Sequence, residues 1–120
     1  MKRNYKIEFN NFSQILGQGG PYIADLYIDK KFISHSVLAD NYVVKNNIIV
    51  FSFFQLVSYF AINNFFSIII FDLESSEFYN LDLKLNAIYL SSIDDEFNLT
   101  YFEAFNDKDI YLQRQISIKS

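Results

Sequence analysis

Apolar and polar residues alternate along much of the chain, and this period of two is typical of half-buried β-strands. At the start of the chain, Tyr5, Ile7 and Phe9 alternate with Lys6 and Glu8. We therefore predict strands throughout the alternating runs. The other runs lie at 22–28, 32–38, 81–85, 97–101 and 110–118.

Turn-forming residues separate these runs. The letters DKK at 29–31 predict a tight turn, and ESSE at 74–77 predicts a second one. Farther on, NDKD at 106–109 has the composition of a hairpin turn, so we expect it to link the last two strands. Turn signals at this spacing indicate antiparallel strands.

The segment LGQGGPY at 16–22 contains all three glycines and the single proline of the chain. A phosphate-binding glycine loop must lead into a helix, whereas Pro21 leads into an alternating run. We therefore predict that this segment is a bend. Together with Asn10 and Asn11 it is expected to form a long loop after the first strand.

These patterns predict an all-β fold of mainly antiparallel sheet, arranged as a sandwich, a meander or blade-like sheets. The length of 120 residues predicts one domain spanning 1–120. Hydrophobic residues make up 51% of the chain and aromatic residues 19%, which excludes disorder. Phe, Tyr, Ile and Val also favour strands over helices.

The segment 46–71 has no charged residue, so its length alone would allow it to span a membrane. Several Asn, Ser and Gln residues interrupt it, and Asn63-Asn64 has the composition of a hairpin turn. We therefore predict two buried strands here, with 68–71 covered on both faces. One short helix within 51–60 is the alternative for that part, and a membrane segment is the alternative for the whole.

The residue types exclude several kinds of site. Because the chain has no cysteine, it contains no disulfide, no thiolate zinc site and no thiol nucleophile. His35 is the only histidine, and its neighbours Ser34 and Ser36 point to the opposite face of a strand. We predict no catalytic residues, no metal site and no cofactor, and therefore a protein that is not an enzyme.

The net charge of −4 is unevenly distributed. Residues 1–45 carry six basic and four acidic side chains, whereas residues 46–120 carry four basic and ten acidic ones. This balance argues against nucleic-acid binding, which needs a basic surface, and suits a basic protein partner. We predict that the partner contacts Asp94, Asp95, Glu96 and Tyr101. A solvated acidic face that only maintains solubility is the alternative.

Two segments resemble small β-rich bacterial immunity proteins, the partners of secreted toxins. They are GPYIADLYIDKKFIS at 20–34 and FFSIIIFDLESSEFY at 65–79, and the second is also similar to the last two strands of a propeller blade. The resemblance implies tight binding that occludes the active site of a toxin. It assigns no individual residue.

The functional expectation is a non-enzymatic protein-binding module, most specifically an immunity protein that binds a basic toxin or effector domain. A self-associating structural β protein, forming a homo-oligomer, is one alternative, and a small carboxylate-dependent hydrolase is another. The polar residues Asn4, Lys6, Glu8 and Asn10 interrupt any apolar signal region, so we expect a cytoplasmic protein.

Overall fold

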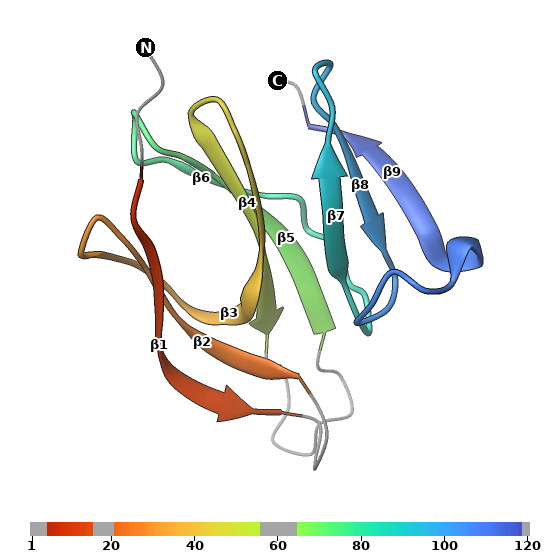
Figure 1. Cartoon of the computed structure of the whole chain (residues 1–120), viewed down its shortest axis with the longest axis horizontal. Helices are drawn as coiled ribbons and strands as arrows, with labels where there is room; N and C mark the ends of the chain where they lie inside the picture. The colour runs from red at the N-terminus through yellow and green to blue at the C-terminus, as the bar shows by residue number, and fades with distance from the viewer. Residues whose placement is uncertain (1–4, 16–20, 56–64, 119–120) are drawn as a thin grey trace. The chain divides into compact units, whose positions relative to one another are not determined.

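The computed structural model describes residues 5–15, 21–55 and 65–118, and it confirms the all-β prediction (Figure 1). The chain forms two compact units, Met1–Asp40 (unit 1) and Asn41–Ser120 (unit 2). The strands are β1 Ile7–Gln14, β2 Tyr22–Ile28, β3 Lys31–Lys45, β4 Ile48–Gln55, β5 Phe65–Asp72, β6 Phe78–Asn80, β7 Tyr89–Ile93, β8 Asn98–Phe102 and β9 Gln113–Ser117, with a 3-10 turn, η1, at Ile110–Leu112.

Unit 1 is an antiparallel meander in which β2 pairs with β1 on one side and with the first part of β3 on the other. The predicted tight turn is present, because Ile28 pairs directly with Lys31 across Asp29 and Lys30. Both turn residues have positive φ, 51° and 68°, as a type I′ hairpin turn requires. Alternation in β2 places Ala24, Leu26 and Ile28 on the buried face.

The loop expected to begin at Asn10 is wrong, because β1 continues to Gln14. The pairing with β2 shifts register between Asn10 and Ser13, and Asn11 has a φ of 58°. A β-bulge lets the strand continue, and Asn tolerates this left-handed conformation better than most residues. After β1, the Ile15 N–H donates to the Pro21 carbonyl over 3.0 Å. The glycines of the predicted bend lie outside the described residues.

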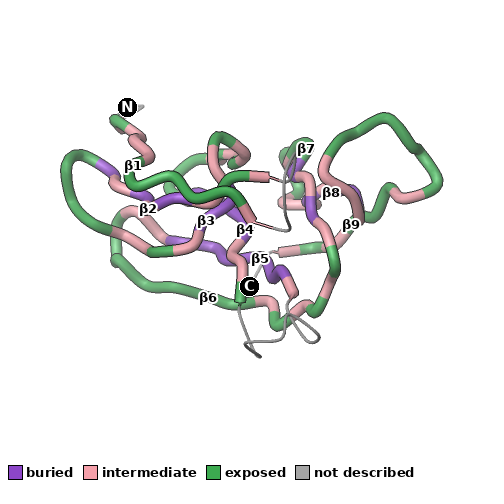
Figure 2. Tube along the Cα trace, turned by 90° about the horizontal axis from the view of Figure 1, so that it is seen from below, coloured by how far each residue is buried: buried purple, intermediate pink, exposed green. Residues whose placement is uncertain are grey.

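Unit 2 contains the end of β3 followed by β4, β5 and β6, in that order across the sheet. β4 and β5 pair over their full length, from Ile48 opposite Asp72 to Gln55 opposite Phe65. The prediction of two buried strands is confirmed, since residues 49–52 of β4 are buried and Ile68–Phe71 of β5 are buried as well, as Figure 2 shows along β5.

The sequence left two alternatives for the uncharged segment 46–71, a short helix within 51–60 and a membrane span. Residues 51–55 belong to β4, so the short-helix alternative is wrong for them, while 56–60 and Asn63-Asn64 lie outside the described residues. Among the residues that the structure describes, no helix is long and apolar enough to cross a membrane.

Two predicted strands, at 81–85 and 110–118, differ from the structure. β6 ends at Asn80, whose side-chain oxygen accepts the Asp82 N–H over 2.7 Å, and Asp82 has a positive φ of 55° that interrupts the extended backbone. The predicted strand over 81–85 does not form, although the Leu81 N–H donates to the Ile68 carbonyl over 3.0 Å and Leu85 forms an isolated bridge with Phe66. Likewise Ile110–Leu112 form η1 instead of the start of β9, because the Asp109 side chain caps that turn.

The second sheet of unit 2 contains β7, β8 and β9 side by side, with β8 in the centre (Figure 1). Sequence analysis did not predict β7. The Asn41 side chain, from β3, links this sheet to the first one by two hydrogen bonds to the Leu90 backbone. Its Nδ2 donates to the carbonyl over 3.1 Å, and its Oδ1 accepts the N–H over 2.8 Å.

Candidate functional site

The acidic turn, Asp94, Asp95 and Glu96, connects β7 to β8. It is closed by backbone hydrogen bonds, from the Phe97 N–H to the Asp94 carbonyl and from the Asp94 N–H to the Asn98 carbonyl, both 3.1 Å. Because this turn is short, the three acids that the sequence predicted as a contact site lie together.

The side chains of the three acidic residues make different contacts. The Asp94 carboxylate accepts the N–H groups of Glu96 and Asn98, each over 2.9 Å, and the Asn98 side-chain amide over 3.2 Å. These hydrogen bonds, first those from Asn98, lower the pKa of Asp94. Asp95 is 97% exposed and forms an ion pair with Lys45. Glu96 is exposed, and no described residue forms an ion pair with it. Asp94 therefore holds the turn, and Glu96 remains available for a partner.

Asp94 makes folding sensitive to acid. Because its pKa is lowered in the folded state, its carboxylate stabilises the fold above the usual Asp pKa of about 3.9, and this contribution is lost as the pH falls through the lowered value. We expect Asp94→Asn, which cannot ionise, to be less stable than the parent near pH 6 and to approach it near pH 3. Urea unfolding at both pH values measures this, with Asp95→Asn as the matched control. An identical pH response of the two variants would contradict the assignment.

Tyr101, the fourth predicted contact residue, is placed differently. It lies in β8 and is only 7% exposed. Burial, and secondarily the Glu103 carboxylate, raises the pKa of its phenol. Its ring is therefore packed inside the fold and does not share the surface of the acidic turn.

The sequence analysis missed an exposed apolar pair, Ile110 and Tyr111, which we call the tip. These side chains are 71% and 86% exposed. The Asp109 carboxylate accepts the Tyr111 N–H over 3.0 Å, and Arg114 Nη1 donates to the Tyr111 carbonyl over 3.0 Å. An Asp directly before an apolar pair was the available signal, but the alternation of 110–118 suggested a strand.

Contacts with Glu103 stabilise the backbone near the tip, and acidic residues lie beside it. Arg114 Nε lies 3.3 Å from a Glu103 carboxylate oxygen, and the Glu103 N–H donates to the Leu112 carbonyl over 2.9 Å. Asp107 and Asp109 are exposed immediately before the tip. The structure thus presents an aromatic ring on a fixed backbone in acidic surroundings.

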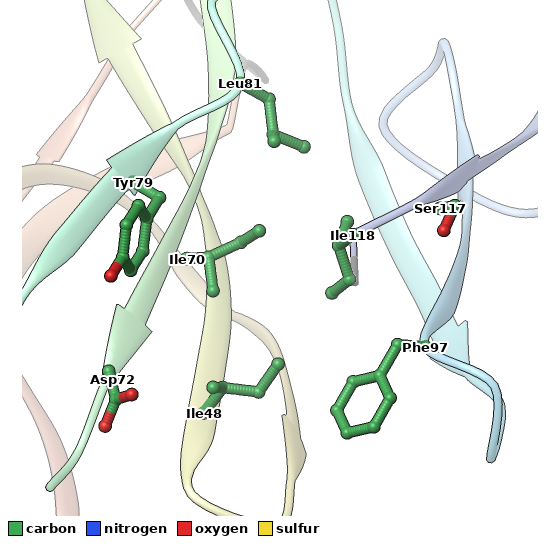
Figure 3. Close-up of a pocket in the computed structure, with 8 residues that line it drawn as sticks. All are labelled: Ile48, Ile70, Asp72, Tyr79, Leu81, Phe97, Ser117 and Ile118. Carbon is green, nitrogen blue, oxygen red and sulfur yellow. The ribbon is translucent and has the colours of Figure 1, made fainter. Parts of the chain in front are cut away.

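An apolar groove of about 410 Å³ opens between the two sheets of unit 2 (Figure 3). Ile48, Ile70 and Leu81 lie on one side of it, and Phe97 and Ile118 lie on the other. Its polar lining residues are Asp72, Tyr79 and Ser117. Since Phe97 follows Glu96 directly, the groove begins at the end of the acidic turn.

Unit 1 positions the single histidine. His35 Nδ1 lies 2.7 Å from one Asp25 oxygen, and the Asn11 side-chain amide donates to the other over 2.8 Å. These two bonds, that from Asn11 first, lower the pKa of Asp25. The Ser34 hydroxyl donates to the His35 backbone carbonyl, and in the part of the chain that the structure describes no serine hydroxyl is bonded to the imidazole. The arrangement is an Asp–His pair without an attached nucleophile.

No family model, curated protein or solved structure matches the chain. In the described ranges there is also no group of three His, Asp or Glu side chains placed to hold a metal ion. The candidate binding surfaces of unit 2 are therefore the acidic turn, the tip and the groove.

Proposed function

We propose that the chain is a non-enzymatic protein-binding module for a basic partner, and specifically an immunity protein that occludes the active site of a cognate toxin. The observation that carries this proposal is the tip, with Tyr111 86% exposed on a backbone held by Asp109 and Arg114.

A fixed and exposed tyrosine is suited to binding. Binding energy in protein interfaces is concentrated in a few side chains, among which Tyr is enriched. Because the hydrogen bonds from Asp109 and Arg114 already order the backbone of Tyr111, a partner would have less conformational entropy to remove. Burial of Ile110 beside the ring would add apolar area to the same contact.

The charge of unit 2 supports a basic partner. Its described residues carry ten acidic side chains against four basic ones, Lys45, Lys84, Lys108 and Arg114. Exposed acids lie at both ends of β8, in the acidic turn and beside the tip. Such a surface accelerates the encounter with a positively charged protein and disfavours acidic ones.

The test compares tagged wild-type protein with Tyr111→Ala in capture from cells of the organism of origin. We expect the wild type to retain one basic protein in stoichiometric amount, and Tyr111→Ala to weaken its binding at least about thirtyfold. Tyr22→Ala, which removes an exposed tyrosine of unit 1, is the matched control and should bind like the wild type. Complex formation should also abolish the enzymatic activity of the captured protein.

Two results would overturn the proposal. In one, the chain is recovered alone or only with copies of itself, which would favour a self-associating protein. In the other, Tyr111→Ala binds the partner as tightly as the wild type does. A captured protein that keeps its full activity in the complex would reject the immunity role and leave only protein binding.

A further inference from the structure

We propose that the groove binds a short segment of the basic partner in which an aliphatic side chain stands next to Lys or Arg. This inference rests on the proposed function, because it names a second contact with the same partner. The tip residues Ile110 and Tyr111 do not line the groove, so the two contacts are separate.

The groove has the size and lining for an aliphatic side chain. Its volume of about 410 Å³ lies within the range of known ligand pockets, about 300–1,000 Å³. In Figure 3, Ile48 and Ile70 extend from one sheet toward Phe97 and Ile118 of the other. A leucine or isoleucine entering this space would lose its apolar surface from water on both sides.

The charges around the groove select a basic neighbour for that side chain. Asp72 lines the groove, and Glu74 and Glu77 follow it in the turn between β5 and β6. The acidic turn precedes Phe97 on the other side. None of the eight described residues that line the groove is basic. A Lys or Arg beside the bound aliphatic residue would therefore meet carboxylates from both turns.

The Asp72 carboxylate is fixed in position. One of its oxygens accepts the Glu74 N–H over 2.9 Å and the Ser75 N–H over 3.1 Å. A carboxylate that is already ordered by its own turn can accept an ammonium or guanidinium group with little further ordering. Its place in the groove lining sets where the positive charge of the segment would lie.

Phe97 provides the variant that tests the groove. Its φ is 61°, a left-handed conformation that is rare for a bulky residue and natural for glycine. The ring nevertheless forms part of one side of the groove, beside Ile118. Phe97→Gly therefore suits the backbone conformation at the end of the acidic turn, while it removes the aromatic ring from that side of the groove.

The experiment titrates the acetylated and amidated peptide Lys-Leu-Lys-Leu-Lys into the ¹⁵N-labelled full chain and follows the amide resonances. We expect saturable shifts at Ile70, Tyr79 and Ile118, and at least about tenfold weaker binding by Phe97→Gly. Tyr79→Ser, which changes a half-exposed lining residue, should also weaken binding if Phe97→Gly fails to fold. Phe12→Ala, in unit 1, is the control and should bind like the wild type.

Control peptides separate the contributions. Replacing Lys by Glu, or Leu by Ser, should each abolish the shifts at the groove. The inference is overturned if the groove resonances do not shift, if Phe97→Gly binds the peptide normally, or if the Glu peptide binds equally well, which would indicate a pocket for neutral apolar ligands.

The two proposals fail in different ways. If Tyr111→Ala loses the captured partner but the peptide leaves the groove unchanged, only the groove inference is wrong. If the peptide binds the groove but no basic protein is captured, the proposed function is wrong. Tyr111→Ala should leave peptide binding unchanged, since the tip does not line the groove.

Discussion

Phe66→Ala is expected to lower the free energy of unfolding by about 3–5 kcal/mol, the usual cost of removing a buried phenylalanine ring. Phe66 is 1% exposed, and its ring centroid lies 5.1 Å from that of Phe54 and 5.3 Å from that of Phe105. The substitution deletes both ring contacts and leaves a cavity between β4, β5 and the segment that follows β8. The backbone hydrogen bonds between Phe66 and Leu85 are retained by alanine, so the loss comes from the ring contacts and the cavity.

Urea unfolding followed by circular dichroism measures this effect. Phe12→Ala is the matched control, because Phe12 is 53% exposed and its truncation should change stability by less than about 1 kcal/mol. Equal losses for the two variants would show that the three rings around Phe66 do not pack as described.

Asn41→Ala is expected to lower the free energy of unfolding by about 2–4 kcal/mol. The Asn41 amide satisfies both the N–H and the carbonyl of Leu90, and Leu90 is 2% exposed. Alanine leaves both groups without a partner, and each buried unsatisfied group costs about 1–3 kcal/mol. The effect is larger than that of an ordinary hydrogen bond because two backbone groups lose their partner together.

Asn106→Ala serves as the control in the same unfolding assay. The Asn106 side chain also binds a backbone group, the Lys108 N–H over 3.0 Å, but it does so in an exposed loop where water can replace it. If Asn41→Ala lowers the free energy of unfolding no more than Asn106→Ala does, the hydrogen bonds between Asn41 and Leu90 contribute little to stability.

Alternation predicted most strands well because it reports which face of a strand is buried. The second strand was predicted with the bounds that β2 has, since a two-residue turn follows it at once. The errors lie where side chains bind the backbone. Asn11 allows β1 to continue through a bulge, and Asn80 and Asp109 end or delay strands by accepting N–H groups. Such local hydrogen bonds compete with the sheet, and hydrophobic periodicity does not report them.

The candidate site was only partly accessible from the sequence. Asp94, Asp95 and Glu96 are adjacent in the chain, so their proximity followed directly, but their separate roles depend on the geometry of the turn. Choosing between Tyr101 and Tyr111 required knowing which ring is buried. Both follow strand-like patterns, and only the cap at Asp109 places Tyr111 outside the sheet.

The order of the strands has a consequence for how the chain folds. Within each sheet every strand pairs with its neighbours in the sequence, so these pairings close short loops and require little loop entropy. The contacts of Asn41 with Leu90 and of Lys45 with Asp95 instead join residues 49 and 50 positions apart. Hairpins should therefore form first, and the link between β3 and β7 should form after the folding barrier. Loss of these contacts should then raise the rate at which unit 2 opens more than it lowers the rate at which it folds.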